Sequence, residues 1–281
     1  MPTTHAEQIT AVAGAADSSV ERPHGTLMHP DEWVSQRIAS PPAIVDSILP
    51  AQGGEYILVA GRTGIGKSIL MLNLLYAIGT GTPFLGYGCE RTSAGMLIME
   101  GDRANIQNRI RKVKEQYPAT ESIALDFRLD MKPLERNLEY YVETFGGCRV
   151  VMLDNLKQVT TSERLKNEYA SNWLATFQRF LRDINAVGIL THHVRKQNAN
   201  SLIEPGDVYE LKGAGEYVED ASTVILLERE RQQRGDSGQF LPVDPNRVTL
   251  YFAKHRIATR TLEPIRLERN YETAGFDILS S

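Results

Sequence analysis

The sequence predicts an α/β fold in which a mostly parallel central sheet is flanked by helices and turns antiparallel toward its end. Short apolar runs alternate with segments of helical spacing, which is typical of strands joined by crossover helices. A glycine-rich loop at residues 61–68 lies between one apolar run and one helical segment. The chain has 281 residues, of which 42% are hydrophobic, enough to form the core of one large α/β domain.

The expected elements follow in chain order. Residues 1–30 are rich in Ala, Thr, Ser and Gly and predict a flexible N-terminal tail, so the folded domain is expected over residues 31–281. A short lead-in helix is expected between residues 30 and 49, on charged and apolar positions there: Asp31, Glu32, Trp33, Ile44, Val45, Ile48 and Leu49. Apolar runs predict strands at residues 56–60, 96–99, 123–129, 149–154, 187–191, 223–227, 248–253 and 265–270. Spacing and glycine breaks predict helices at residues 68–78, 103–117, 133–145 and 170–184.

The glycine-rich loop matches the complete G-x-x-x-x-G-K-[ST] phosphate-binding pattern with Gly61, Arg62, Thr63, Gly64, Ile65, Gly66, Lys67 and Ser68. Its glycines allow backbone N–H groups to turn inward around phosphates. Lys67 supplies a charge for the β and γ oxygens, and the Ser68 hydroxyl is a ligand for Mg²⁺. The helix that follows adds its positive amino-terminal end. The loop therefore predicts binding of a nucleoside triphosphate, and a chance glycine turn is the weaker interpretation.

Polar residues that end apolar strands are the next candidates, because parallel sheets bind ligands beyond the carboxyl ends of their strands. Glu100 follows residues 96–99 and is a candidate to orient or deprotonate the attacking water; the alternative is a solvated strand end. Asp154 ends the run at residues 149–154 and is a candidate to hold a Mg²⁺-bound water near Ser68. A loop-capping aspartate is the alternative there.

Two adjacent histidines, His192 and His193, end the strand expected at residues 187–191. Neighbouring side chains on a strand point to opposite faces, which argues against one metal ion bound by both. We expect His193 to sense the γ-phosphate, with His192 as the second choice and a hydrogen-bonded core histidine as the structural alternative.

The bulk properties restrict the remaining possibilities. The net charge is −4, so nucleic-acid contact requires a local patch or a channel lined by several subunits. The chain has two isolated cysteines, Cys89 and Cys148, which fit a reducing compartment and exclude a CxxC zinc site. No apolar run approaches the length needed to span a bilayer. We expect a cytoplasmic protein with no membrane partner.

Taken in order, these motifs resemble the RecA-like ATPases. The resemblance includes the phosphate loop, Glu100, Asp154, the histidine pair and two later segments, the Gly-rich stretch at residues 211–221 and Phe252-Ala253-Lys254-His255-Arg256. Within that group the sequence looks most like the DnaB-type hexameric replicative helicases and the short plasmid-encoded RepA helicases. The similarity covers about residues 40–279, and the two later segments are its most selective part.

The resemblance implies a RecA-like core that forms a homo-oligomer, by family pattern a hexameric ring, with ATP and Mg²⁺ bound between subunits. Lys254 and Arg256 match the positions that reach the neighbouring subunit's γ-phosphate. Side chains two residues apart on a strand share a face, which suits this role. Without the resemblance, solvated charges on an edge strand would be the preferred interpretation.

In this family, single-stranded DNA passes two loops inside the ring, and the matching segments are residues 157–167 and 194–213. Both contain basic and amide side chains suited to tracking a nucleic-acid backbone, although ordinary polar surface loops have a similar composition. The predicted function is an ATP-dependent DNA helicase. The alternatives are a regulatory ATPase switch and a recombinase-like DNA-binding ATPase without unwinding activity. The polar excursion at residues 228–246 receives no role.

Overall fold

The computed structural model describes residues 29–36, 42–117, 123–127, 133–156, 167–194, 206–207, 215–229, 244–257 and 261–280. The chain divides into two compact units, Met1–Ser40 and Pro41–Ser281. In the first unit, helix α2 (Pro30–Ser35) begins after His29, whose Nδ1 accepts a hydrogen bond from the Asp31 backbone N–H at 3.3 Å. Trp33, on this helix, is 57% exposed.

The expected helix between residues 30 and 49 is present only as α2. The apolar positions behind it form a two-stranded antiparallel hairpin, β1 (Ala43–Val45) and β2 (Leu49–Pro50). Ile44, Val45, Ile48 and Leu49 are all buried in the core of the second unit. Four apolar residues within six positions are compatible with both a helix and a strand. Here packing against the core stabilises the two strands.

The second unit is built on a nine-stranded sheet of order β11-β10-β9-β8-β3-β7-β6-β4-β5. The strands are β3 (Tyr56–Gly61), β4 (Ala94–Ile98), β5 (Ile123–Phe127), β6 (Val150–Asp154), β7 (Val187–His193), β8 (Thr223–Arg229), β9 (Arg247–His255), β10 (Ile265–Asn270) and β11 (Gly275–Ile278). The six strands from β8 to β5 pair in parallel, and β9, β10 and β11 add antiparallel pairs at the other side. The predicted fold class is therefore confirmed.

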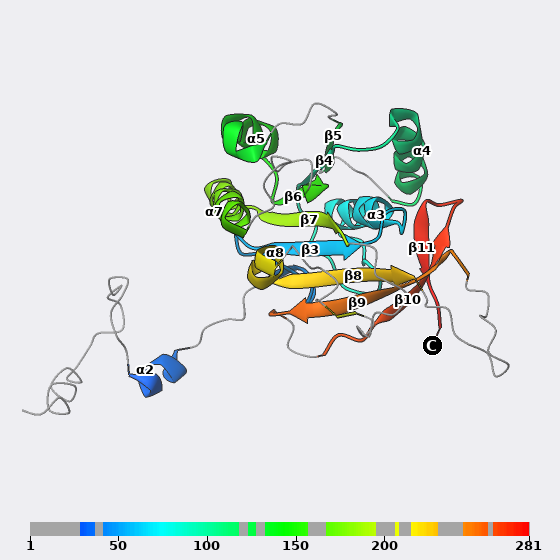
Figure 1. Cartoon of the computed structure of the whole chain (residues 1–281). Coiled ribbons are helices and arrows are strands. Elements are labelled where there is room, and N and C mark those ends of the chain that lie inside the picture. Colours follow the sequence, from blue (N-terminus) through cyan, green and yellow to red (C-terminus); the bar gives the residue numbers. More distant parts are fainter. Residues whose placement is uncertain are drawn as a thin grey trace, which may run out of the picture. The chain divides into compact units, whose positions relative to one another are not determined.

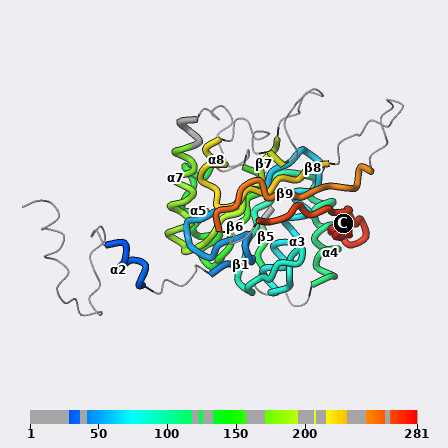
Figure 2. The backbone as a smooth tube through the Cα atoms, turned by 90° about the horizontal axis from the view of Figure 1, so that it is seen from below, coloured from blue at the N-terminus to red at the C-terminus, as the bar shows by residue number. Residues whose placement is uncertain are grey.

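Helices cover both faces of this sheet (Figures 1 and 2). They are α3 (Lys67–Thr80), α4 (Arg103–Lys114), the 3-10 turn η1 (Leu134–Arg136), α5 (Leu138–Phe145), α7 (Asn167–Asp183) and α8 (Gly215–Asp220). One buried cluster joins α3, α4 and the β1–β2 hairpin to one face, and a second joins α5, α7 and α8 to the other. Because the central strands are buried on both faces, they appear in the sequence as continuous apolar runs.

The second cluster is rich in aromatic rings. Trp173 and Phe177 of α7 stack at 5.1 Å between ring centroids, and Tyr217 of α8 meets Trp173 edge-on at 5.9 Å. Tyr56, at the start of β3, contacts Phe177 in the same way at 6.2 Å. Pairs of this geometry contribute about 0.5–1.5 kcal/mol each beyond simple burial. They fix α7 and α8 against the first residue of β3.

Besides the β1–β2 hairpin, strand β11 and helix α8 of the second unit were not expected from the sequence. Strand β11 is short, and its sequence Gly-Phe-Asp-Ile contains no long apolar run. Helix α8 lies at the end of a Gly-rich stretch that the sequence identifies only as a family motif. Among the described helices, none has both the length and the apolar character needed to cross a membrane.

Candidate nucleotide site

The phosphate loop connects the carboxyl end of β3 to α3, as the sequence predicts. Gly64 has φ +77° and Gly66 has φ +110°, conformations in which a side chain is strained. At Gly66 the space is also closed, because an added Cβ would lie 2.7 Å from Cζ of Phe276 in β11. The C-terminal hairpin β10–β11 therefore reaches the phosphate loop, a contact that the local motif does not reveal.

Lys67 opens α3 and is 5% exposed. Its ammonium donates to the carbonyl oxygens of Gly61 at 2.8 Å and Arg62 at 3.1 Å, and its Nζ lies 3.1 Å from Nδ1 of His193. Burial lowers the pKa of Lys67 to about 8, against the opposing effect of Asp154 and Glu100. Burial disfavours the charged form of Lys67, and a phosphate anion at this position would offset that cost.

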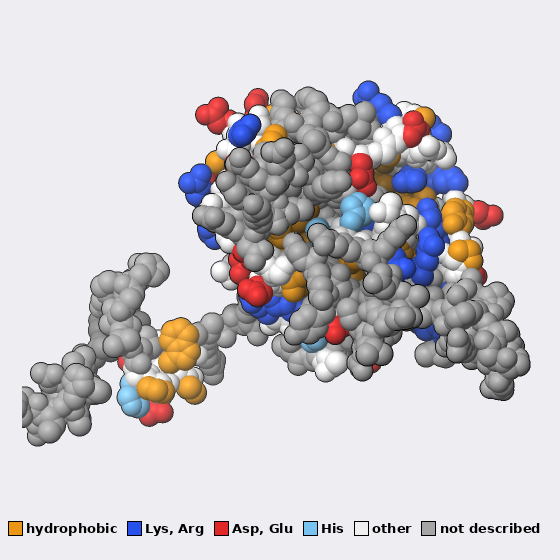
Figure 3. Space-filling view, in the orientation of Figure 1, with side chains coloured by type: hydrophobic (Ala, Val, Ile, Leu, Met, Phe, Trp, Pro, Cys, Tyr) orange, Lys and Arg blue, Asp and Glu red, His pale blue; other side chains and the backbone are white. Residues whose placement is uncertain are grey.

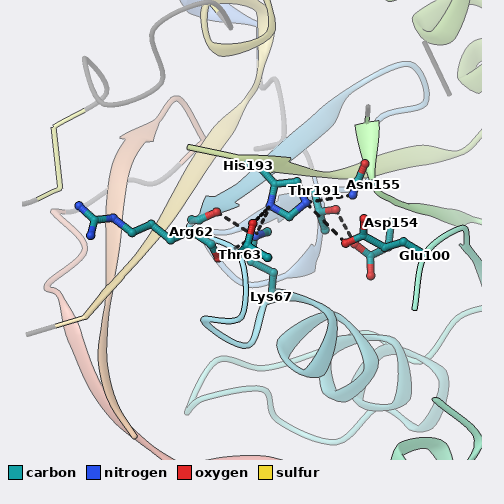
Figure 4. Close-up of polar contacts among 9 residues, drawn as sticks. Arg62, Thr63, Lys67, Glu100, Asp154, Asn155, Thr191 and His193 are labelled. Atoms are coloured by element: carbon teal, nitrogen blue, oxygen red, sulfur yellow. Dashed lines mark hydrogen bonds and ion pairs between the residues drawn. The ribbon is translucent and has the colours of Figure 1, made fainter. Parts of the chain in front are cut away.

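His193 stands at the centre of the site (Figure 4). The pairing of β3 with β7 sets it opposite Gly61, the first loop residue. Its Nδ1 faces Lys67 and, at 3.4 Å, the Thr63 hydroxyl, while its Nε2 lies 3.5 Å from Oε1 of Glu100. Because the Lys67 ammonium can only donate, Nδ1 accepts from it, and the proton of a neutral ring then belongs on Nε2. The ring thus joins the phosphate loop to the acidic strand end.

Asn155 extends this chain of contacts. Its amide nitrogen is placed 3.0 Å from Nε2 of His193, and its Oδ1 is buried without a hydrogen-bond partner in the described structure. An Nε2–H requires an acceptor, so the amide orientation with Oδ1 toward the ring satisfies both groups. The peptide between Asp154 and Asn155 is cis. Sequence analysis did not select Asn155; the available signal was its position directly after Asp154.

The electrostatics keep the His193 ring neutral. Its pKa is lowered chiefly by burial and then by the positive charge of Lys67, while Glu100 and Asp154 act in the opposite direction. His192 follows the alternation of the strand, and burial together with His193 and Lys67 lowers its pKa to about 4. Two neutral imidazoles on opposite faces do not form one metal site. Among the described residues no cluster of three or more His, Cys, Asp or Glu could hold a metal ion.

Asp154 ends β6 and is 2% exposed. Its Oδ1 accepts a hydrogen bond from the Thr191 hydroxyl at 2.6 Å, which fixes the carboxylate. Its Oδ2 is buried and has no protein partner in the described structure. An orphaned carboxylate oxygen is costly unless a cation or an ordered water meets it. The donor set of Asp154 and the Ser68 hydroxyl, one carboxylate and one hydroxyl oxygen, therefore fits the oxygen preference of Mg²⁺.

Glu100 follows β4, and its side chain is 39% exposed. It is the acidic group of the site that solvent reaches, in contrast to the buried Asp154. Helix α4 starts three residues later at Arg103, capped by Asp102, which accepts from the Asn105 N–H at 2.9 Å. Helix α4 contains arginines and lysines but no acidic residue. In Figure 3, several Lys and Arg side chains lie on this side of the molecule.

The predicted residues Lys254 and Arg256, called the basic pair below, lie elsewhere. Strand β9 pairs Lys254 with Val224 and His255 with Thr223, and Thr223 lies beside Ile57 near the start of β3. The phosphate loop leaves the opposite end of β3. At about 3.3 Å per residue, the sheet register alone separates Lys254 from Gly61 by roughly 10 Å along the strands.

The two predicted DNA loops fall largely outside the described residues. Of residues 157–167 only the start of α7 is described, and of residues 194–213 only Val194, Gly206 and Asp207. The Gly206 N–H donates to Oε1 of Glu228 in β8 at 2.7 Å, and a Cβ added at Gly206 would lie 2.7 Å from Cδ1 of Tyr251 in β9. Gly206 itself is therefore held against β8 and β9. Most of the excursion at residues 228–246 also lies outside the described part.

The sheet order, the phosphate loop and the strand-end residues together define a P-loop ATPase with a RecA-like fold. Residues 21–199 match the model of a family described as AAA domain, and the chain belongs to that family.

Similar proteins agree with this class. The sequence is 24% identical over 272 residues to a protein named DNA helicase/primase from Enterobacteria phage T3. That alignment covers 83% of this chain and 44% of the phage protein, so the chain spans less than half of that relative's length.

Two solved structures share the fold. One, titled as an ATPase domain, has a TM-score of 0.60 at 15% identity, with 82% of this chain and 86% of that chain covered. The other, the KaiC-like protein PH0186 from Pyrococcus horikoshii OT3, has a TM-score of 0.54 at 14% identity, with 87% and 99% covered. The resemblance to RecA-like ATPases that the sequence predicts is thereby confirmed.

Proposed function

We propose that the chain is a ring-forming, ATP-dependent DNA helicase that moves on single-stranded DNA and hydrolyses ATP at subunit interfaces. The main support is the position of the basic pair. Lys254 and Arg256 lie at the end of the sheet away from the phosphate loop of their own chain, so we expect them to act on a triphosphate bound by a second copy. Cations that stabilise a transferred phosphoryl group must touch it, so this arrangement favours catalysis in trans.

Within one subunit, we assign each candidate residue of the nucleotide site a role according to its position. The phosphate-loop amides and Lys67 bind the β and γ phosphates. Ser68 and Asp154 would hold Mg²⁺, which would supply charge neutralisation at those phosphates. Glu100, the solvent-accessible carboxylate, orients the attacking water and takes its proton. His193 senses the γ-phosphate, because it contacts Lys67 and Glu100 at once.

The proposed work on DNA rests on one relative and on the anchoring of one loop. The phage relative is named DNA helicase/primase. The second loop of this chain is anchored at Gly206, as expected for a loop that transmits force. We propose that residues 157–167 and 194–213 contact single-stranded DNA from several subunits at once. A hexamer is the ring size that the family pattern favours, in a reducing, cytoplasmic setting consistent with two unpaired cysteines.

The test is ATP hydrolysis with and without single-stranded DNA, together with the mass of the assembled particle. Hydrolysis stimulated by DNA and a closed ring of six subunits would support the proposal. A monomer with full activity would contradict hydrolysis at interfaces. Slow hydrolysis that ignores DNA would instead favour a regulatory ATPase, which the net charge of −4 makes the second candidate. Open helical filaments would indicate a recombinase-like protein.

A further inference from the structure

Asn155 directly follows Asp154 at the end of β6, and none of the roles proposed above involves its side chain. The residue is 1% exposed, whereas the side chains of His193 and Glu100 are 28% and 39% exposed. A buried amide is costly unless it is hydrogen-bonded. Among the described residues, the ring of His193 is the one hydrogen-bond partner of this amide. The Asn155 side chain therefore belongs to the nucleotide site rather than to the core.

The proton on Nε2 of His193 has two neighbouring acceptors. The Asn155 amide lies 3.0 Å from Nε2, and Oε1 of Glu100 lies 3.5 Å from it. Figure 4 shows both side chains at this edge of the ring. Hydrogen bonds from N–H to oxygen span about 2.7–3.2 Å, so the amide is within range and the carboxylate is just beyond it. With Oδ1 turned toward the ring, Asn155 accepts the proton and Glu100 does not.

This bond also fixes the opposite edge of the ring. Nδ1 of His193 accepts from Lys67 at 3.1 Å and faces the Thr63 hydroxyl at 3.4 Å. In a neutral imidazole, the nitrogen that carries the proton is set by the hydrogen bond that the other nitrogen makes. A ring turned over about its Cβ–Cγ bond would lose the contacts with Lys67 and Asn155 together. Asn155 thus holds the acceptor nitrogen of His193 toward the phosphate loop.

The separation of His193 from Glu100 matters, because the two residues have different tasks in the proposed function. A general base must turn toward the water and keep a lone pair for its proton. A carboxylate that accepts from an imidazole N–H is instead held toward the ring, and a hydrogen bond to its charged form makes it less basic. Hydrogen bonds to an ionised acceptor are also about twice as strong as neutral ones. Glu100 bonded to His193 would therefore be a poorer base.

We propose that Asn155 is a positioning residue for hydrolysis, which accepts the Nε2 proton of His193 and so keeps Glu100 free to engage the attacking water. This inference rests on the roles that the proposed function gives to His193 and Glu100. Without Asn155, the acceptor that remains for this proton among the described residues is Glu100. The ring and the carboxylate then close the gap between them, and Glu100 turns away from the water.

The first experiment measures steady-state ATP hydrolysis by the full chain with Asn155→Leu, which keeps the size of the side chain and removes its polar atoms. We expect kcat to fall about tenfold, the effect of about one hydrogen bond, with KM for ATP unchanged because Lys67 and the phosphate loop are intact. In the background of His193→Leu, the same substitution is expected to cause no further loss, because no ring proton remains to be kept from Glu100. A residue that only supports the fold would lower kcat equally in both backgrounds.

Asn137→Leu is the matched control, because the Asn137 amide donates to the Pro133 carbonyl at 2.9 Å outside the nucleotide site. We expect it to keep wild-type kcat. A second measurement needs no substitution at residue 155. Nitrogen NMR spectra of the protein labelled with 15N-histidine show which ring nitrogen carries the proton, and the signals of His193 are those lost in His193→Leu. A neutral ring with its proton on Nε2 is expected.

The outcomes separate the inference from the proposed function. Full hydrolysis in both His193→Leu and Glu100→Gln would show that the proposed roles are wrong, and the inference fails with them. If these two variants lose activity while Asn155→Leu behaves as wild type, the roles stand and the inference alone is wrong. A proton on Nδ1 of His193 would overturn it as well, as would an equal loss from Asn155→Leu in the two backgrounds.

Discussion

The carboxyl end of the central sheet holds its candidate residues on neighbouring parallel strands, whereas the amino end holds the basic pair through contacts from distant segments. At the carboxyl end, Lys67, Glu100, Asp154 and His193 each lie at or just beyond the end of a buried strand, so sheet order alone brings them together. At the amino end, β9, α8 and the start of β3 meet only after the whole unit has folded. The arrangement at the carboxyl end follows from local sequence signals and strand order, whereas the arrangement at the amino end depends on long-range packing.

The largest expected effect comes from the carboxyl end. Lys67→Ala removes the buried ammonium that contacts the loop carbonyls and His193, and we expect hydrolysis of ATP to fall by about 1,000-fold or more. The fold should persist, because α3 is packed through its apolar residues. Steady-state hydrolysis and thermal unfolding measure the two. Lys114→Ala, at an exposed position of α4, is the matched control, and substantial activity in the Lys67 variant would refute the site.

The second prediction asks whether the two ends serve different subunits. Arg256→Ala is expected to lower kcat by about 100-fold or more, with little change in KM for ATP. A mixture of Lys67→Ala and Arg256→Ala chains should recover activity. In a mixed ring, some interfaces receive an intact phosphate loop from one chain and an intact basic pair from the other. Failure to recover activity, although mixed rings form, would indicate that both residues serve the same subunit.

Much of the carboxyl end could be predicted from the sequence for this same reason. A phosphate loop and polar residues that end apolar runs are local signals, and the sheet brings them together without further information. Asn155 and Thr191 were missed, because their roles depend on which side-chain atoms they face. The contacts of α8 with Tyr56 and Lys254 were missed for a stronger reason. They join residues 161 and 35 positions apart, which no local pattern encodes.

A third prediction concerns the contact between the phosphate loop and β11. Gly66→Ala combines a strained φ with a collision against Phe276, whereas Gly64→Ala has the strained φ but open space. We expect the Gly66 variant to lose about tenfold or more in ATP affinity and the Gly64 variant clearly less. Nucleotide binding measured by titration checks this order. Equal losses of ATP affinity in the two variants would mean that the Phe276 ring moves aside at no energetic cost.

The smallest effect is expected at Thr191. Thr191→Val leaves Oδ1 of the buried Asp154 without its donor, which should cost about 1–3 kcal/mol of unfolding free energy and several-fold in kcat. Thr191→Ser keeps the hydroxyl and should restore most of both quantities. Chemical denaturation and hydrolysis assays on the two variants measure them. A Val variant of wild-type stability would show that this hydrogen bond contributes nothing to holding the carboxylate.

The chain has two tryptophans in opposite surroundings, and this has a practical consequence. Trp173 is 1% exposed, between Phe177 and Tyr217, whereas Trp33 on α2 is 57% exposed. Their intrinsic fluorescence is therefore separable, since iodide quenches an indole in water far more than one enclosed by aromatic rings. With Trp33→Phe as background, the emission of Trp173 becomes an optical probe beside α8, able to follow that helix in real time as nucleotide and DNA are added.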